Sequence, residues 1–165
     1  MYKEYPWFYD SMSFQGIKDQ LFGSGYTGSG DLNRFTGIFT VCSKLFGGDI
    51  LKTIFGLGLG NAYSKSMLGS YPMFFNNFYY THYDWFSSTY TTVQAGFFGL
   101  LIYLSTFINL IFKKKINKEY TLNSQIMCIL ALFLVFYGEA LKTDAGYLIY
   151  FAISSGFVKL GGNDE

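Results

Sequence analysis

Two side chains in the sequence stand out for acid–base and anion-binding chemistry, because Arg34 is the only arginine and His82 the only histidine. Arginine stays charged, and its planar guanidinium binds phosphate oxygens in pairs. Histidine exchanges a proton near neutral pH and serves as a general base. Each residue also has an ordinary interpretation: a solvated or snorkelling arginine, and an interfacial histidine among aromatic residues.

Metal and nucleic-acid chemistry find no support in the rest of the chain. The net charge of +1 gives no basic field for nucleic acid. No acid-rich or histidine-rich cluster is present, and the two cysteines, Cys42 and Cys128, lie far apart in apolar runs. We therefore expect no metal, no cofactor and no nucleic-acid partner, and two cysteines that act as small buried hydrophobes.

The composition is that of a membrane protein. Half of the residues are hydrophobic, 22% are aromatic and only 14% are charged, against about 25% charged in soluble domains. The 19 phenylalanines and 15 tyrosines also exclude a disordered chain.

Three runs without a charged residue predict membrane-spanning helices over residues 91–112, 120–138 and 145–158. The third run is short for a span. Lysines crowd the connection at residues 113–119, which the positive-inside rule places in the cytoplasm. The sequence thus predicts an all-α, multi-pass membrane protein with two or three transmembrane helices within residues 91–165.

The first ninety residues carry scattered charges and dense aromatics, which indicates an extracytoplasmic loop with short helices lying against the membrane. We expect Asp31 to cap a helix over residues 32–46 that contains Arg34, and Asp49 to cap a helix over residues 50–55. A loop of this length reaches the outside only if earlier spans precede it. We therefore expect the chain to be the C-terminal fragment of a larger protein.

Two sets of glycines are expected to have structural roles. Gly56, Gly58 and Gly60 follow a GxGxG spacing, but no strand precedes them, which favours a tightly packed loop over a dinucleotide site. Gly96 and Gly99 are three residues apart, and so would share one helix face and let another helix approach closely.

The order of these features resembles the O-antigen ligase and O-antigen polymerase family of bacterial surface-polysaccharide enzymes. The resemblance covers roughly residues 28–112. It consists of the arginine segment GSGDLNRFTGIF, the glycine loop LKTIFGLGLGNAYS, His82, and the glycine-marked span QAGFFGLLIYL before the lysines. Gln94 stands where the family has an acid.

The resemblance implies a glycosyltransferase-type polymerase of the inner (plasma) membrane that joins undecaprenyl-diphosphate-linked repeat units of a capsule or O-antigen on the outer face. It implies that Arg34 holds the diphosphate and that His82 is the base. It also implies that Tyr80, Tyr83 and Trp85 stack on sugars, although an interfacial role for them is equally open. The partners would be the lipid-linked glycan, the bilayer and other polysaccharide-assembly proteins.

Two alternatives stay open. The first is an O-antigen ligase, which differs only in its acceptor. The second is a non-enzymatic, truncated membrane protein, since the fragment alone is expected to be inactive even where its full-length parent is an enzyme. A transporter is disfavoured because the predicted spans lack charged residues.

Overall fold

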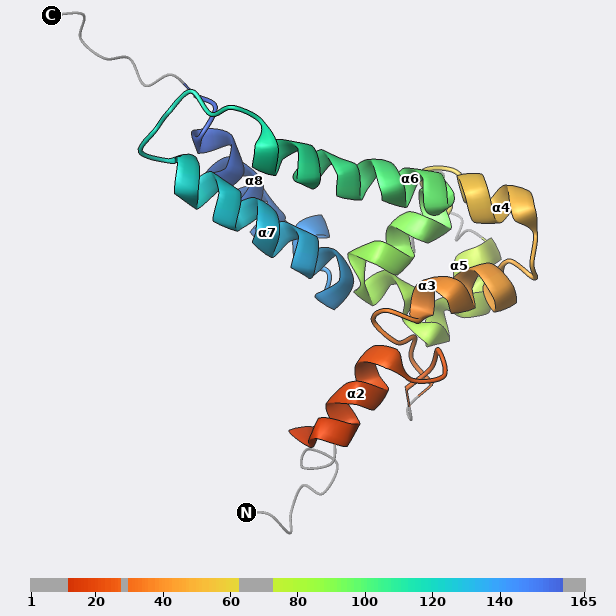
Figure 1. Ribbon diagram of the computed structural model, residues 1–165. Coiled ribbons are helices and arrows are strands. Elements are labelled where there is room, and N and C mark those ends of the chain that lie inside the picture. The colour runs from red at the N-terminus through yellow and green to blue at the C-terminus, as the bar shows by residue number, and fades with distance from the viewer. Residues whose placement is uncertain (1–11, 28–29, 63–72, 159–165) are drawn as a thin grey trace, which may run out of the picture.

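The computed structural model describes residues 12–27, 30–62 and 73–158, and the regular structure of this part is helical (Figure 1). Its elements are α2 (Phe14–Phe22), α3 (Gly37–Thr40), the π turn η1 (Val41–Leu45), α4 (Ile50–Phe55), α5 (Met73–Phe78), the 3₁₀ turns η2 (Tyr79–Thr81) and η3 (Tyr83–Trp85), α6 (Ser87–Phe112), α7 (Thr121–Tyr137), the 3₁₀ turn η4 (Ala140–Lys142) and α8 (Asp144–Ser155). In the described ranges, β pairing is limited to one isolated bridge between Tyr26 and Leu32. The expected all-α class is confirmed for these ranges. The predicted outer loop at 1–11 and 63–72 and the tail at 159–165 lie outside them.

The three charge-free runs form α6, α7 and α8, which pack together as a bundle (Figure 1). Their shared core is built from apolar side chains facing inward: Leu100, Phe107, Cys128, Ala131, Val135, Leu141 and Ile153. A polar contact supports it where the Ser124 hydroxyl donates to the carbonyl of Ile153 at 2.7 Å. Cys128 is fully buried, as expected of a small hydrophobe, and Cys42 is half-buried.

Helix α6 is the one helix, among the residues described, that is long and apolar enough to cross a membrane. Helix α7 is apolar but shorter, with 17 residues, and α8 has 12. At a rise of about 1.5 Å per residue, α8 reaches only about 18 Å. The prediction of helices is therefore confirmed, while their crossing of a bilayer is taken up below as a proposal.

Helix α6 contains a break at Gly96, whose φ of 66° and ψ of −168° are not helical. The polar residues before the break, including Ser87, Ser88, Thr89 and Thr92, are buried. The residues after the break carry large exposed hydrophobes. The expectation that Gly96 and Gly99 share one face of a continuous helix was wrong, because Gly96 is where the helix turns. The apolar part of the helix therefore starts at residue 97.

The break in α6 is held by close contact with the glycine loop that follows α4. Gly56 also has a positive φ, 73°, and a Cβ atom there would collide with the backbone of Gln94 and Ala95. A Cβ atom on Gly96 would collide with the backbone of Ile54 and Phe55. The N–H groups of Leu57 and Gly58 donate to the carbonyls of Val93 and Gln94, both at 2.9 Å. Only glycine suits both positions, Gly56 and Gly96. The predicted tight packing of the loop is confirmed at Gly56, whereas a Cβ atom on Gly60 would meet nothing within 4 Å.

A second core lies under the loops that precede α6. It consists of Leu32, Val41, Leu45, Phe46, Ala62, Tyr83 and Val93. On another side, the ring of Phe35 stacks between Phe22 of α2 and Phe136 of α7, with both centroid distances at 5.3 Å. These contacts join the predicted outer region to the helix bundle.

The expected helix over residues 32–46 begins later than the sequence suggested. Regular helix starts only at Gly37, and Thr36 takes the N-cap position. Asp31 is not a cap, and Arg34 lies in the turn before α3. The pairing of Leu32 with Thr81, in which the Leu32 N–H donates at 3.0 Å, holds this stretch extended instead. The predicted cap at Asp49 is confirmed, since its side chain accepts from the N–H groups of Leu51 and Lys52.

The glycine contact predicts an unequal cost of two similar substitutions. Gly96→Ala should lower the free energy of unfolding by more than Gly60→Ala, because both residues have positive φ but only Gly96 faces backbone within collision distance. A positive φ penalises alanine at both positions, and the collision with backbone adds to that penalty at Gly96. Thermal unfolding of the purified variants measures the difference, and equal midpoints would contradict the contact.

Candidate functional site

Two segments far apart in the sequence, residues 31–34 and 81–86, meet at one end of the bundle. The N–H of Leu32 donates to the carbonyl of Thr81, and Leu32, Asn33 and Thr81 are all buried. This pairing places Asp31 beside His82. We call this junction the site.

Asp31 and His82 form the central contact of the site. His82 Nδ1 lies 2.5 Å from Asp31 Oδ1. The imidazole also stacks on the indole of Trp85, with ring centroids 4.0 Å apart. A carboxylate at this distance accepts the proton of Nδ1–H, which leaves Nε2 as the nitrogen able to accept a proton. The pair therefore gives His82 the arrangement of an oriented general base.

The backbone of His82 is in an unusual conformation. With φ 49° and ψ 39°, it is the one residue other than glycine with positive φ in the described ranges. Its N–H donates to Tyr79 and its carbonyl accepts from Trp85, so it links η2 to η3. A left-handed conformation costs about 1–2 kcal/mol for an ordinary residue, and the surrounding contacts must offset it. Strain of this kind concentrates at functional sites.

Arg34 lies at the same junction, against the C-terminal end of α7. Its Nε donates to the carbonyl of Tyr137 at 3.4 Å, and its guanidinium lies 4.6 Å from the centroid of the Tyr137 ring. It also lies 5.7 Å from the centroid of Phe86, four residues after His82. A cation at a helix C-terminus is favoured by the helix dipole. The structure thus brings both candidate residues, Arg34 and His82, to one junction.

The three aromatic candidates differ in their exposure. Tyr80 and Trp85 have exposed rings, and the indole of Trp85 stacks on the imidazole of His82. Tyr83 is fully buried: its hydroxyl donates to the carbonyl of Ala62 at 2.9 Å, and its ring packs against Phe74. Burial raises the pKa of the Tyr83 phenol. Tyr83 offers no accessible ring face, so its place is in the core rather than on a binding surface.

Two further polar residues belong to the site, although the sequence did not mark them as functional. Asp31 was expected to cap a helix and instead pairs with His82 across 51 positions. Lys142, from the connection between α7 and α8, donates from Nζ to the carbonyl of Asp84 and lies 4.5 Å from the Tyr90 ring centroid. No local sequence pattern could have indicated either contact, because both depend on tertiary packing.

The site offers no evident metal centre. In residues 12–27, 30–62 and 73–158, no three His, Cys, Asp or Glu side chains gather in a way that could hold a metal ion. Comparison of the chain with models of known protein families, with curated proteins and with solved structures found no match.

The Asp31–His82 contact predicts the tautomer of the imidazole. With the only histidine labelled with ¹⁵N, the neutral side chain should carry its proton on Nδ1 in the unsubstituted chain. Asp31→Ala should shift the proton toward Nε2, whereas Asp19→Ala, which removes an exposed carboxylate elsewhere, should leave it on Nδ1. NMR at alkaline pH measures the two nitrogen shifts. The same tautomer in all three proteins would show that Asp31 does not orient His82.

Proposed function

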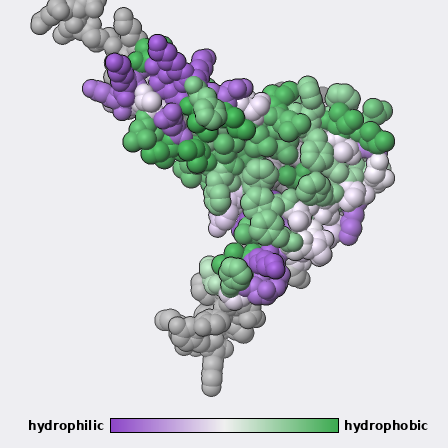
Figure 2. Space-filling view, viewed as in Figure 1, coloured by the Kyte–Doolittle hydropathy of each residue, from purple (hydrophilic) through white to green (hydrophobic). Residues whose placement is uncertain are grey.

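We propose that the chain belongs to a multi-pass membrane protein and that α6 to α8 lie in a bilayer. The outward faces of these helices are apolar and include Phe98, Leu101, Ile108, Leu122, Ile126, Ile129, Phe133, Leu148 and Phe151, all exposed. Figure 2 shows hydrophobic surface spread over this bundle. An apolar surface of this extent is unusual for a protein in water and is typical of one in lipid.

The lysines support an orientation for the bundle. Lys113, Lys114 and Lys118 are exposed in the connection between α6 and α7, and hydrophilic surface gathers at that end of the bundle (Figure 2). Lys115 is different: it is buried, donates to the carbonyls of Leu110 and Ile111, and so caps the end of α6. Three exposed lysines beside a span favour the cytoplasmic side, which leaves the site at the outer face.

We further propose that the complete protein is a surface-polysaccharide polymerase whose donor is an undecaprenyl-diphosphate-linked glycan. The observation that carries the proposal is the oriented Asp31–His82 pair, with Arg34 at the same junction against Phe86, at the end of the bundle opposite the exposed lysines. The resemblance of the sequence to O-antigen polymerases and ligases supports the same chemistry. An outer-face site suits a donor whose lipid is anchored in the bilayer.

The proposed reaction balances without a metal. A hydroxyl of the acceptor glycan forms a bond to the anomeric carbon of the donor, while the bond from that carbon to the diphosphate oxygen breaks. The hydroxyl proton passes to Nε2 of His82, which Asp31 orients. Undecaprenyl diphosphate leaves with the electron pair, and Arg34 stabilises its charge. Attack from the face opposite the leaving group inverts the configuration.

The exposed aromatic rings at the site fit a glycan substrate. Trp85, which stacks on His82, and Tyr80, two residues before His82, are both exposed, and flat aromatic faces pack against the apolar faces of sugar rings. A ligase would use the same residues with a different acceptor. A non-enzymatic membrane protein is the alternative favoured by the contact of Arg34 with Tyr137, since that contact also serves to join the loops to the bundle.

Topology provides the first test. A reporter enzyme that works only in the cytoplasm should be active when fused after Lys115 and inactive when fused after Gly60. A reporter that works only outside the cell membrane should be active after Gly60 alone, because the exposed lysines keep their end of the bundle in the cytoplasm. Both are scored in cells that make the complete protein. The opposite pattern would place the site in the wrong compartment and exclude the proposed donor.

Substitutions in the complete protein provide the second test. His82→Ala should slow glycan transfer by about 10²- to 10⁴-fold through loss of the base. Arg34→Ala should lower it by about 10- to 150-fold, from a charge-assisted contact of roughly 1.5–3 kcal/mol, and Arg34→Lys should restore only part. Polymer synthesis from the lipid-linked repeat unit measures the rates.

Two comparisons separate a chemical role from a structural one. Asp31→Ala should slow transfer in the presence of His82 but have little further effect in His82→Ala, because Asp31 acts through the imidazole. Lys18→Ala, on the exposed face of α2, is the matched control for loss of a cation. The catalytic roles would be wrong if His82→Ala and Arg34→Ala, each present in the membrane at its normal level, both made normal polymer. His82 and Arg34 would then have structural roles only.

A further inference from the structure

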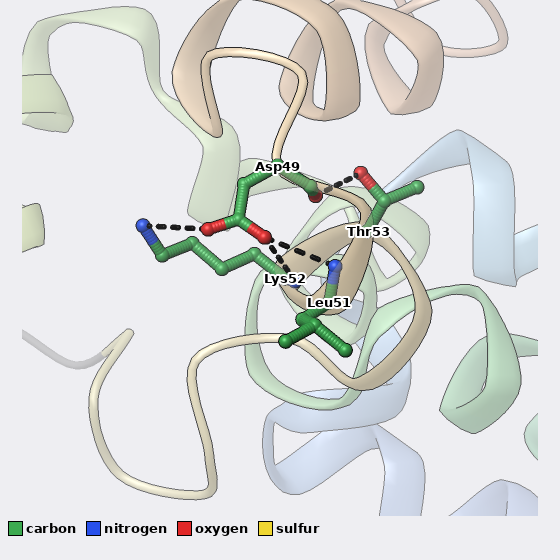
Figure 3. A network of polar contacts seen from close by, with 4 residues as sticks. All are labelled: Asp49, Leu51, Lys52 and Thr53. Atoms are coloured by element: carbon green, nitrogen blue, oxygen red, sulfur yellow. Dashed lines mark hydrogen bonds and ion pairs between the residues drawn. The ribbon is translucent and has the colours of Figure 1, made fainter.

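Helix α4 is a well-formed helix whose large side chains point away from the protein. Asp49 caps it, accepting from the N–H of Leu51 at 3.0 Å and of Lys52 at 3.2 Å, while the Thr53 hydroxyl donates to the Asp49 carbonyl (Figure 3). The N–H of Lys52 lowers the pKa of the Asp49 carboxyl. The cap therefore fixes the start of α4 and the direction in which its side chains point.

The outer face of α4 is apolar. At 3.6 residues per turn, Ile50, Leu51, Ile54 and Phe55 fall on one side of the helix, and they are 71%, 69%, 40% and 61% exposed. Leu59 in the glycine loop is 84% exposed. The opposite side of α4 carries the half-buried Thr53 and leads into Gly56 against α6.

This face is fixed relative to α6 and continues its outer surface. The contacts of Gly56 and Gly96 and the bonds from Leu57 and Gly58 hold the end of α4 against the break in α6. The ring of Phe55 meets that of Phe98 at a centroid distance of 6.4 Å. Figure 2 shows hydrophobic surface on α6 extending to the end where α4 lies.

The distance from the lysines places α4 near the outer boundary of the hydrocarbon. From Gly96 to Lys113, helix α6 rises by about 25 Å, and a bilayer core is about 30 Å thick. Helix α4 would therefore lie where acyl chains meet headgroups. Its two charged groups suit that level, because Lys52 Nζ and Asp49 Oδ2 form a partly exposed ion pair at 3.2 Å.

We infer that α4 and Leu59 form an interfacial anchor, with the side chains of Ile50, Leu51, Phe55 and Leu59 among the acyl chains of the outer leaflet. The inference rests on the bilayer placement proposed above and goes beyond it, since the sequence placed residues 1–90 against the membrane as a whole and the structure identifies one helix face that would enter it. The occupant of this face is lipid, and the partner chemistry is that of the bilayer itself.

Spin labels test the anchor in the full chain. Cys42 and Cys128, the only cysteines, are replaced by alanine, and single cysteines are introduced by Leu51→Cys, Lys52→Cys, Leu59→Cys or Leu101→Cys. Each labelled protein is placed in vesicles of phosphatidylcholine and phosphatidylglycerol. Power saturation then compares access of oxygen, which enters lipid, with access of a water-soluble nickel chelate.

We expect oxygen to be favoured at positions 51, 59 and 101, and the nickel chelate to have greater access at position 52 than at 51. The label at position 59 lies outside any helix and so does not depend on α4 tolerating substitution. If 51 and 59 were open to nickel while 101 was in lipid, the anchor would be wrong and the bilayer placement would stand. If the nickel chelate reached positions 51, 59 and 101 alike, both the anchor and the bilayer placement of α6 to α8 would be wrong. Shielding of 51 and 59 from both reagents would mean that protein covers α4, which also rules out the anchor.

Discussion

The close contact between Gly56 and Gly96 is the constraint on which the rest of the structure depends. Because neither residue carries a Cβ atom, the backbone after α4 reaches the backbone of α6 at the point where that helix breaks. The break separates a buried polar half, which packs with the loops, from an apolar half, which packs in the bundle. Without it, a straight α6 would carry its serines and threonines along the same axis as its exposed hydrophobes.

The position of the site follows from this division. The buried half of α6 starts at Ser87, whose N–H and hydroxyl both bond to the carbonyl of Gly138 just after α7. This junction fixes η3 and His82, which precede Ser87, against the end of the bundle. The extended pairing of Leu32 with Thr81 then brings Asp31 to the imidazole. The pair therefore depends on the tertiary fold rather than on a local motif.

The sequence predicted the elements that depend on local rules. Charge-free runs indicated α6, α7 and α8, and Asp49 and Gly56 marked the ends of α4, because hydrophobic content and capping act over a few residues. It failed at Asp31, where a favourable cap residue was drawn into contact with a histidine 51 positions away. It also failed at Tyr83, since density of aromatic residues does not distinguish a buried ring from an exposed one.

The structural contacts of Arg34 are compatible with the anion-binding role proposed for it. Its bond to the Tyr137 carbonyl is long, at 3.4 Å, and a cation over an aromatic ring contributes about 0.5–1 kcal/mol at exposed sites. A charge-assisted bond to an anion is stronger, at about 1.5–3 kcal/mol. The contacts with Tyr137 and Phe86 help to orient the guanidinium, and each is weaker than the charge-assisted bond that the proposed diphosphate would form. In the proposed role, a guanidinium that is already held would lose less conformational freedom on binding an anion than an unrestrained arginine would, and this smaller entropy loss would favour binding.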